Sequence, residues 1–219
     1  MADLHRTRGE AIEGKPRSLP PLGTPGGGGE GGELSPTDAL TLEHDLIRRV
    51  TDAMERSLTR LEDNETIDPL LLQRIVDFVE TYAHRVHHGK EEEILFRELH
   101  RKDLEPAYRR TMEELAREHV EMRGLVADLT EGLEAYRSGD GKYLTSIREA
   151  LSGLIEIYPV HLEREEETFF PNVGHYLDED EIVAVLEGMA GHDRAVIHEK
   201  YGRLAEGLVG RTEDWELQE

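Results

Sequence analysis

Two short stretches of the chain repeat one pattern of possible metal ligands. Residues 87–96 and residues 161–170 both read His-x-x-x-Glu-Glu-x-x-apolar-Phe. Residues four apart on a helix share one face, one turn apart. An imidazole nitrogen beside a carboxylate oxygen suits a transition metal such as iron. The candidate ligands from these stretches are His87, Glu91, His161 and Glu165.

Each stretch is preceded by an isolated Glu-His pair at nearly the same distance. His44 lies 43 residues before His87, and His119 lies 42 residues before His161. The two halves of the chain therefore form an internal repeat, which makes chance agreement much less credible than it would be for one motif.

The positions of these histidines relative to the expected turns place them at one height. His44 lies about 19 residues before the turn near Asp63, and His87 lies about 18 residues after Pro69. At about 1.5 Å rise per residue, the two heights differ by only a few ångströms. The same count holds for His119 and His161 in the second half. We therefore expect four imidazoles at one level.

Glu91 and Glu165 would follow one turn along their helices and bridge two metals, each with two histidines. Helix bundles commonly hold dinuclear iron or manganese sites of this kind. Mixed nitrogen and oxygen ligands favour iron over calcium or magnesium. Without a metal, the same groups would be a costly buried polar cluster.

The elements that must position these ligands are helices. Apolar residues recur at helical spacing, and no alternating strand pattern of useful length appears. In the first helix we expect the stripe Leu42, Leu46, Val50, Met54 and Leu58 to face inward. The expected helices run from Ser35 to about Leu61, Asp68 to His100, Pro106 to Arg137, Lys142 to Phe170 (ended by Pro171), and Asp178 to Leu208 with a break near residue 190.

The predicted fold is all-α: an antiparallel up-and-down four-helix bundle with an additional C-terminal helix. Residues 1–35 are rich in Gly and Pro and predict a disordered tail. Residues 36–175 would form the bundle, and residues 176–219 would form a helical extension packed on it.

Composition limits the function classes. The net charge of -22 opposes binding to nucleic acid, whose phosphates attract basic patches. No apolar run approaches a membrane span, and the first residues lack a secretory core, so a cytoplasmic location is expected. The absence of cysteine excludes thiolate-ligated zinc and iron–sulfur sites.

The combination of motifs resembles the hemerythrin-like HHE cation-binding family over about residues 38–175. The resemblance implies a non-haem di-iron centre with carboxylate bridges and an oxo or hydroxo bridge. The residues that carry it are Glu43-His44, His87-x-x-Lys90-Glu91-Glu92-x-x-Leu95-Phe96, Glu118-His119 and His161-x-x-x-Glu165-Glu166-x-x-Phe169-Phe170-Pro171. The ligands it implies are His44, His87, Glu91, His119, His161 and Glu165.

The second helix offers a competing register, because His88 and Glu92 are also four apart. Alignment to the second stretch, counted back from the terminal Phe, favours His87 and Glu91. Glu43 and Glu118 would hydrogen-bond ligand imidazoles or form salt bridges.

The chain departs from the oxygen-carrying hemerythrins in the third helix. Their pattern resembles His-x-x-x-His, whereas Arg123 stands four residues after His119 here. Two histidines per metal would leave open positions, which suits catalysis better than oxygen carriage. One turn from the ligands, His84 could be a seventh ligand or a proton donor, and Tyr158 a redox or hydrogen-bonding group.

The expected function is an oxidoreductase-like di-iron protein that binds and turns over dioxygen, hydrogen peroxide or nitric oxide with electrons from an unidentified donor. The alternative is a carrier, sensor or iron store without catalysis, and a fifth bound histidine would favour carriage. His192 and His198 would reach the site only if the fifth helix covers the bundle end. His5, His100 and His175 are expected on the surface.

Overall fold

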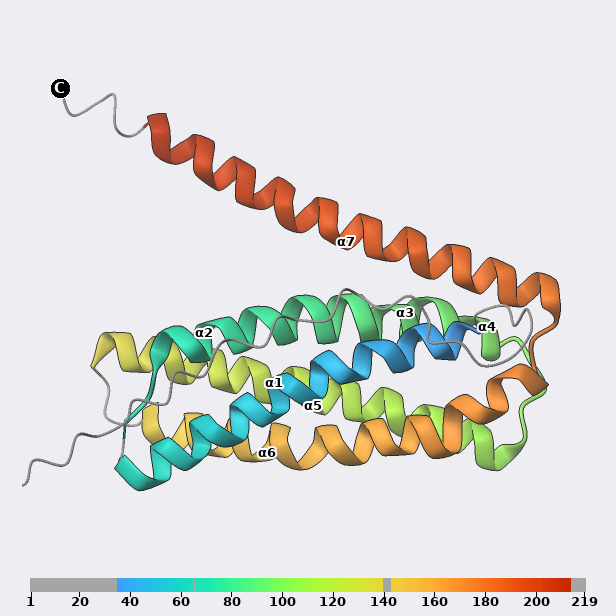
Figure 1. Cartoon of the computed structure of the whole chain (residues 1–219), viewed down its shortest axis with the longest axis horizontal. Coiled ribbons are helices and arrows are strands. Elements are labelled where there is room, and N and C mark those ends of the chain that lie inside the picture. Colours follow the sequence, from blue (N-terminus) through green and yellow to red (C-terminus); the bar gives the residue numbers. More distant parts are fainter. Residues whose placement is uncertain (1–34, 65, 140–142, 214–219) are drawn as a thin grey trace, which may run out of the picture. The chain divides into compact units, whose positions relative to one another are not determined.

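The computed structural model describes residues 35–64, 66–139 and 143–213. All regular elements in these ranges are helical (Figure 1). The tail expected at residues 1–35 lies outside them except for Ser35. The elements are α1 (Pro36–Asn64), α2 (Pro69–Phe78), η1 (Val79–His87), α3 (His88–Lys90), η2 (Glu91–Phe96), α4 (Arg97–Leu99), α5 (Pro106–Ser138), α6 (Tyr143–Arg164), η3 (Glu165–Phe169), η4 (Phe170–His175) and α7 (Glu179–Glu213).

Local capping explains where the helices begin. Ser35 Oγ accepts a hydrogen bond from the Asp38 amide, and the Ser35 amide donates to the Asp38 carboxylate. At the start of α2 the Asp68 carboxylate accepts hydrogen bonds from the amides of Leu70 and Leu71, with Pro69 at the first helical position. Gly139, with φ 76°, ends α5 in the left-handed conformation that glycine adopts without strain.

The long helices pack in a closed series of neighbours. Helix α1 contacts α2 and α6, and α5 contacts the same two helices from the other side. Three π-helical segments, η1, η2 and η3, interrupt the α-helical winding of the second and fourth helical stretches. Wide turns of this kind are rare and often occur at functional sites.

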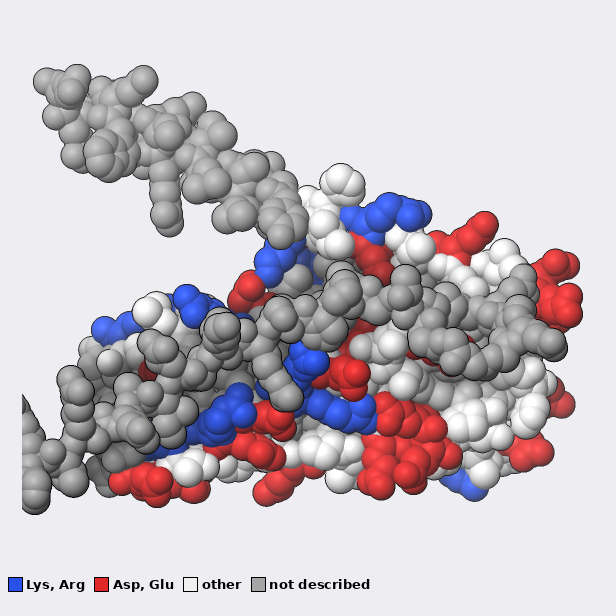
Figure 2. Space-filling view, in the orientation of Figure 1, with Lys and Arg blue, Asp and Glu red and all other residues white. Residues whose placement is uncertain are grey.

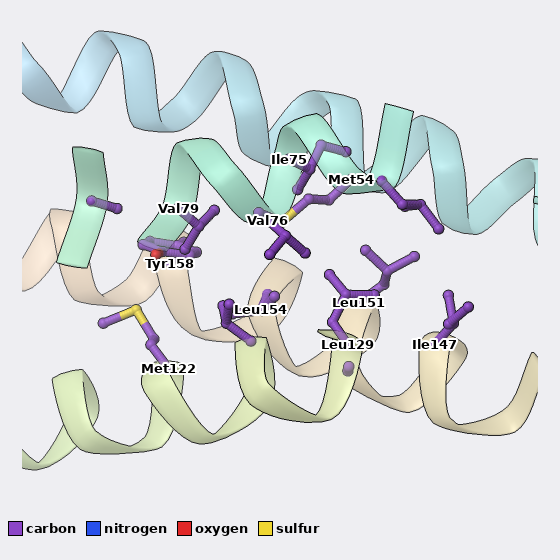
Figure 3. Close-up of a cluster of buried hydrophobic side chains, with 14 of the residues drawn as sticks. Met54, Ile75, Val76, Val79, Met122, Leu129, Ile147, Leu151, Leu154 and Tyr158 are labelled. Atoms are coloured by element: carbon purple, nitrogen blue, oxygen red, sulfur yellow. The ribbon is translucent and has the colours of Figure 1, made fainter. Parts of the chain in front are cut away.

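The core consists of two apolar clusters. Along α1, Leu40 belongs to one cluster and Ile47 to the other, with the buried His44 between them. The same order holds along α5, where His119 separates Leu115 from Met122. A layer of buried polar side chains therefore divides the core. Figure 3 shows the cluster that contains Met54, Val79, Leu154 and Tyr158.

The predicted stripe of α1 is correct only in part. Met54 is buried as expected, whereas Leu42 is 67% exposed. Other buried side chains of α1 lie on a slightly rotated face: Leu40, His44, Ile47, Thr51 and Leu61. Two of these residues are polar, so a count of apolar residues alone does not find the whole face.

The break expected near residue 190 is also absent, since α7 continues through Gly188 and Gly191. A Cβ at Gly188 would lie 3.2 Å from Ile94 Cγ2, so this glycine permits close packing rather than ending a helix. Likewise, helical winding continues past Pro171 as the tighter η4, where proline sits in the first turn and needs no amide partner.

No described helix has the length and apolarity to cross a membrane. On the described part of the face in Figure 2, Asp and Glu residues cover more of the surface than the interspersed Lys and Arg residues do. This balance follows from 48 acidic and 26 basic residues, and it favours solvation.

Candidate metal centre

The polar layer brings together every ligand predicted from the repeat, and each of these side chains is fully buried. Each of the first four helical stretches contributes at least one of them, whereas α7 contributes none, and the two stretches that carry the repeated motif supply the carboxylates. The ligand candidates are His44 from α1, His87 from η1, Glu91 from η2, His119 from α5, His161 from α6 and Glu165 from η3.

The cluster divides into two groups, within each of which one ligand atom per residue lies within 4.8 Å of the others. The first group is His88, Glu91, His119 and His161. The second group is His44, His87 and Glu165.

Each carboxylate lies between the groups. Glu91 Oε1 is 3.8 Å from His87 Nε2, and its Oε2 is 3.4 Å from His119 Nε2. Glu165 Oε2 is 3.2 Å from His44 Nε2, and its Oε1 is 3.2 Å from His161 Nε2. Each glutamate therefore presents one oxygen to each of the two groups.

Four of the histidines use their outer nitrogen, Nδ1, for a hydrogen bond with a glutamate outside the cluster. A carboxylate in this position fixes the ring and leaves Nε2 for a metal. The pairs are His44 with Glu166 at 2.6 Å, His87 with Glu43 at 3.0 Å, His119 with Glu92 at 2.8 Å, and His161 with Glu118 at 2.8 Å.

Every one of these glutamates also pairs with a cation. Arg48 pairs with Glu166 at 2.7 Å and Arg123 with Glu92 at 2.8 Å, while Lys90 pairs with Glu43 and Arg164 with Glu118. Arg123 stands four residues after His119, as Arg48 stands four after His44. The residue found in place of a fifth histidine on α5 therefore has a defined contact of its own.

Glu43 and Glu118 were expected either to bond imidazoles or to form salt bridges, and each does both. Glu92 and Glu166 were missed. The available signal was the second glutamate of each repeated His-x-x-x-Glu-Glu stretch, whose position on the neighbouring face points it toward the next helix.

The structure differs most from expectation at His88. The sequence comparison chose His87 over His88, yet both rings are buried, and His88 belongs to the first group. Its ring stacks on that of His119 with centroids 3.9 Å apart. Consecutive residues of an α-helix point about 100° apart, and the wider turns of η1 reduce this angle. The cluster therefore contains five imidazoles, not four.

The donor set fits a metal. Eight buried ligand atoms in this layer make no hydrogen bond. They are Nε2 of His44 and of His87, both ring nitrogens of His88, and all four carboxylate oxygens of Glu91 and Glu165. Buried polar atoms without partners are costly and rare, so their concentration here points to a ligand that satisfies them. Phe96 stacks on His119 and Phe170 on His44, which closes the layer with apolar rings.

The electrostatics of the metal-free cluster are dominated by burial and by the two carboxylates. Burial and the neighbouring Glu165 raise the pKa of Glu91 well above its usual range. Burial would raise the pKa of Glu165 too, but the His161 charge lowers it strongly. The two carboxyl groups therefore differ: the surroundings favour the neutral form of Glu91 and the charged form of Glu165.

The pKa values of the histidines differ because their surroundings differ. Burial lowers the pKa of His119 to about 4 despite its bond to Glu92. Burial and neighbouring histidines lower the pKa of His88 well below its usual value. Burial acts in the same direction on His161, but Glu165 and Glu118 outweigh it and raise its pKa to about 9.

These shifts predict a stability maximum near pH 6.5 for the metal-free protein. Below the ordinary histidine pKa of 6.5, the unfolded chain binds protons that His84 and His119 of the folded protein do not bind until about pH 4. The folded state therefore loses stability as the pH is lowered from 6.5 to about 4. Above 6.5, folded His161 retains a proton that the unfolded chain releases, so stability falls as pH rises through about 9. Urea unfolding at pH 4.5, 6.5 and 9 with chelator present measures this, and a steady rise or fall across the range would contradict it.

His84 and Tyr158 lie beside the cluster rather than inside it. Tyr158 Oη is 3.5 Å from His84 Nε2, and the His84 ring stacks on His88 with centroids 5.4 Å apart. Burial and the Arg123 charge lower the pKa of His84 to about 4, and burial raises that of Tyr158. His84 also lines a surface hollow of about 590 Å³, so it connects the cluster with the surface.

The remaining histidines stay outside the cluster. His192 of α7 packs on Gly89, and its Nε2 lies 2.6 Å from the Arg85 carbonyl oxygen. His198 is exposed, and the surface positions expected for His100 and His175 are confirmed. His5 lies outside the described residues.

A helical domain with histidines and glutamates gathered in its core belongs to the class of metal-binding helical proteins. The family of hemerythrin HHE cation binding domains matches residues 35–173 and, in a second overlapping match, residues 110–218. The chain belongs to this family. Among curated proteins, the comparison finds no match.

Proposed function

We propose that the cluster holds two iron ions, one in the first group and one in the second group, with Glu91 and Glu165 as bridges. The observation that carries this proposal is the set of buried, unpartnered nitrogen and oxygen atoms that face one another. Family membership supports cation binding, and the mixed donors favour iron. The ligand set is His44, His87, His88, Glu91, His119, His161 and Glu165.

In this proposal, residues 36–175 form the antiparallel up-and-down bundle and residues 176–219 a helical extension packed on it. The contacts of α7 with η1, α3, η2 and α1 support the extension's place. The closed series of contacts among α1, α2, α5 and α6 supports the bundle.

We propose that the centre binds and turns over a small oxidant: hydrogen peroxide, nitric oxide or dioxygen. Iron bound here would supply electrons to the oxidant, and an external donor would restore them. The second group has fewer side-chain ligands than the first, which leaves room for a small molecule. His84 and Tyr158 would move protons between this layer and the surface hollow, which His84 lines.

A second candidate is reversible binding without turnover, as in a carrier, sensor or store. The fifth imidazole, His88, favours it, since fuller coordination of one ion leaves fewer positions for reaction. His84 favours turnover, because a protonatable side chain that touches both the cluster and the hollow has no task in simple carriage.

Loading and mixing experiments test these proposals. Protein loaded with ferrous iron without oxygen is expected to contain about two irons per chain, one for each ligand group, by elemental analysis. It is then mixed in turn with dioxygen, peroxide and nitric oxide while the optical spectrum is followed. Repeated consumption of an oxidant with a reductant present supports turnover, and a stable adduct that is lost under vacuum supports carriage. One zinc per chain and no iron would contradict the di-iron proposal.

A further inference from the structure

Helix α7 is fastened over the helical stretch that carries His87 and His88. A Cβ at Gly89 would lie 2.5 Å from His192 Nε2, so the His192 ring packs directly on this glycine and a larger residue would displace the ring. Farther along α7, Lys200 binds both carboxylate oxygens of Asp77, at 2.7 and 2.9 Å.

Between these two contacts, the carboxylate of Asp193 on α7 lies close to residues that surround the proposed ligand His87. Asp193 Oδ1 lies 3.2 Å from Lys90 Nζ. Lys90 pairs with Glu43, and Glu43 Oε2 lies 3.0 Å from His87 Nδ1. A continuous series of polar contacts therefore runs from α7 to the ring of His87.

This series differs from the three related ones. The cations that pair with Glu166, Glu92 and Glu118 are arginines whose side chains reach solvent. Lys90 is only 2% exposed, so water cannot solvate its charge. A buried ammonium group needs close anions, and Asp193 is the second one that the described contacts give it.

We propose that Asp193 and Lys90 are positioning residues through which α7 sets the orientation of His87 and the metal affinity of the second group. This inference rests on the proposed function, since it requires the second group to hold a metal. With Asp193 present, Lys90 is shared between two carboxylates, and Glu43 keeps an oxygen for His87 Nδ1. Without Asp193, the Lys90 charge draws Glu43 to itself, and the hydrogen bond that orients His87 weakens.

The test is a titration of the full-length metal-free protein with cobalt(II) against a competing chelator. Lys90→Met, which keeps the stem and removes the charge, is expected to weaken one of the two cobalt sites by about tenfold, the low end of the range for outer contacts to a ligand. Asp193→Asn is expected to weaken the same site by a smaller factor and to shift its visible cobalt bands. Asp193→Glu is expected to restore both.

Asp77→Asn is the matched control, because it removes another contact between α7 and the bundle that has no link to a ligand. We expect it to leave both cobalt affinities unchanged. Equal losses in Asp77→Asn and Asp193→Asn, or wild-type affinities in both Asp193→Asn and Lys90→Met, would overturn the inference. If the Asp193→Asn variant loses its helical circular dichroism signal and is therefore unfolded, the cobalt affinities of the Lys90→Met variant decide whether the inference holds.

Failure of the proposed function would look different. Wild-type protein would then take up fewer than two cobalt ions, or the His44→Ala variant would still take up two. Neither result depends on Asp193 or Lys90.

Discussion

Replacing His88 with leucine is expected to stabilise the metal-free protein by about 1–3 kcal/mol, the cost of a buried polar group without a partner. The His88 ring is fully buried, and neither of its nitrogens makes a hydrogen bond. Leucine has a similar volume, so it removes the unpaired atoms without leaving a large cavity. A stabilising mutation at such a buried site would show that the histidine is kept for a role other than stability.

The same variant is expected to lose metal from the first group. Three imidazoles and Glu91 lie together there, and His88 is the imidazole without an outer hydrogen bond. Elemental analysis after loading with ferrous iron should give about one iron per chain instead of about two. Urea unfolding with chelator present measures the first effect.

His100→Leu serves as the control for His88→Leu, because His100 is exposed at the end of the same helical stretch. It should change neither the metal content nor the unfolding midpoint appreciably. A His88→Leu protein that keeps both irons would show that His88 is a buried neighbour and not a ligand.

Glu165→Gln is expected to remove both metals rather than one. Its two carboxylate oxygens lie 3.2 Å from nitrogens of His44 and His161, which belong to different groups. A neutral amide is a poor bridge between two cations, since it lacks the charge that ligation by carboxylates supplies. His44→Ala, which touches one group only, is expected to remove one metal. Iron content of the two variants separates a bridging glutamate from a terminal one.

The metal-free Glu165→Gln protein should also be destabilised, in contrast to His88→Leu. Glu165 raises the pKa of His161, and removing one partner of a buried charged pair typically costs about 3–5 kcal/mol. Glu163→Gln is the matched control, because Glu163 is exposed on the same helix. Equal iron contents in Glu165→Gln and His44→Ala would contradict bridging.

The sequence predicted most of the cluster because the rise of a helix is nearly constant. Counting residues from the turns sufficed to bring His44, His87, His119 and His161 to one layer. The helices themselves followed from apolar spacing and from capping residues such as Ser35 and Asp68.

Rotation about the helix axis was harder to predict than height. A four-residue spacing rule allows either His87 or His88 to face inward, but it does not predict that both rings are buried, as they are beside the wide turns of η1. The inward face of α1 was predicted only in part: His44 and Met54 are buried as expected, but Leu42 is exposed, and the polar Thr51 lies on the buried face. Glycine posed a third problem: a helix break was expected near residue 190, yet α7 continues there and Gly188 packs closely against Ile94.

Each half of the chain supplies a glutamate that bonds a histidine of the other half, so the polar layer resembles an interface between two subunits. His44 in the first half bonds Glu166 from the second, and His119 in the second half bonds Glu92 from the first. Both ligand groups likewise draw on both halves of the repeat. The chain is thus arranged like a dimer whose two subunits have been joined into one polypeptide, with the polar layer between the two halves. Neither half alone contains a complete group, so the two halves must be folded together before either group forms.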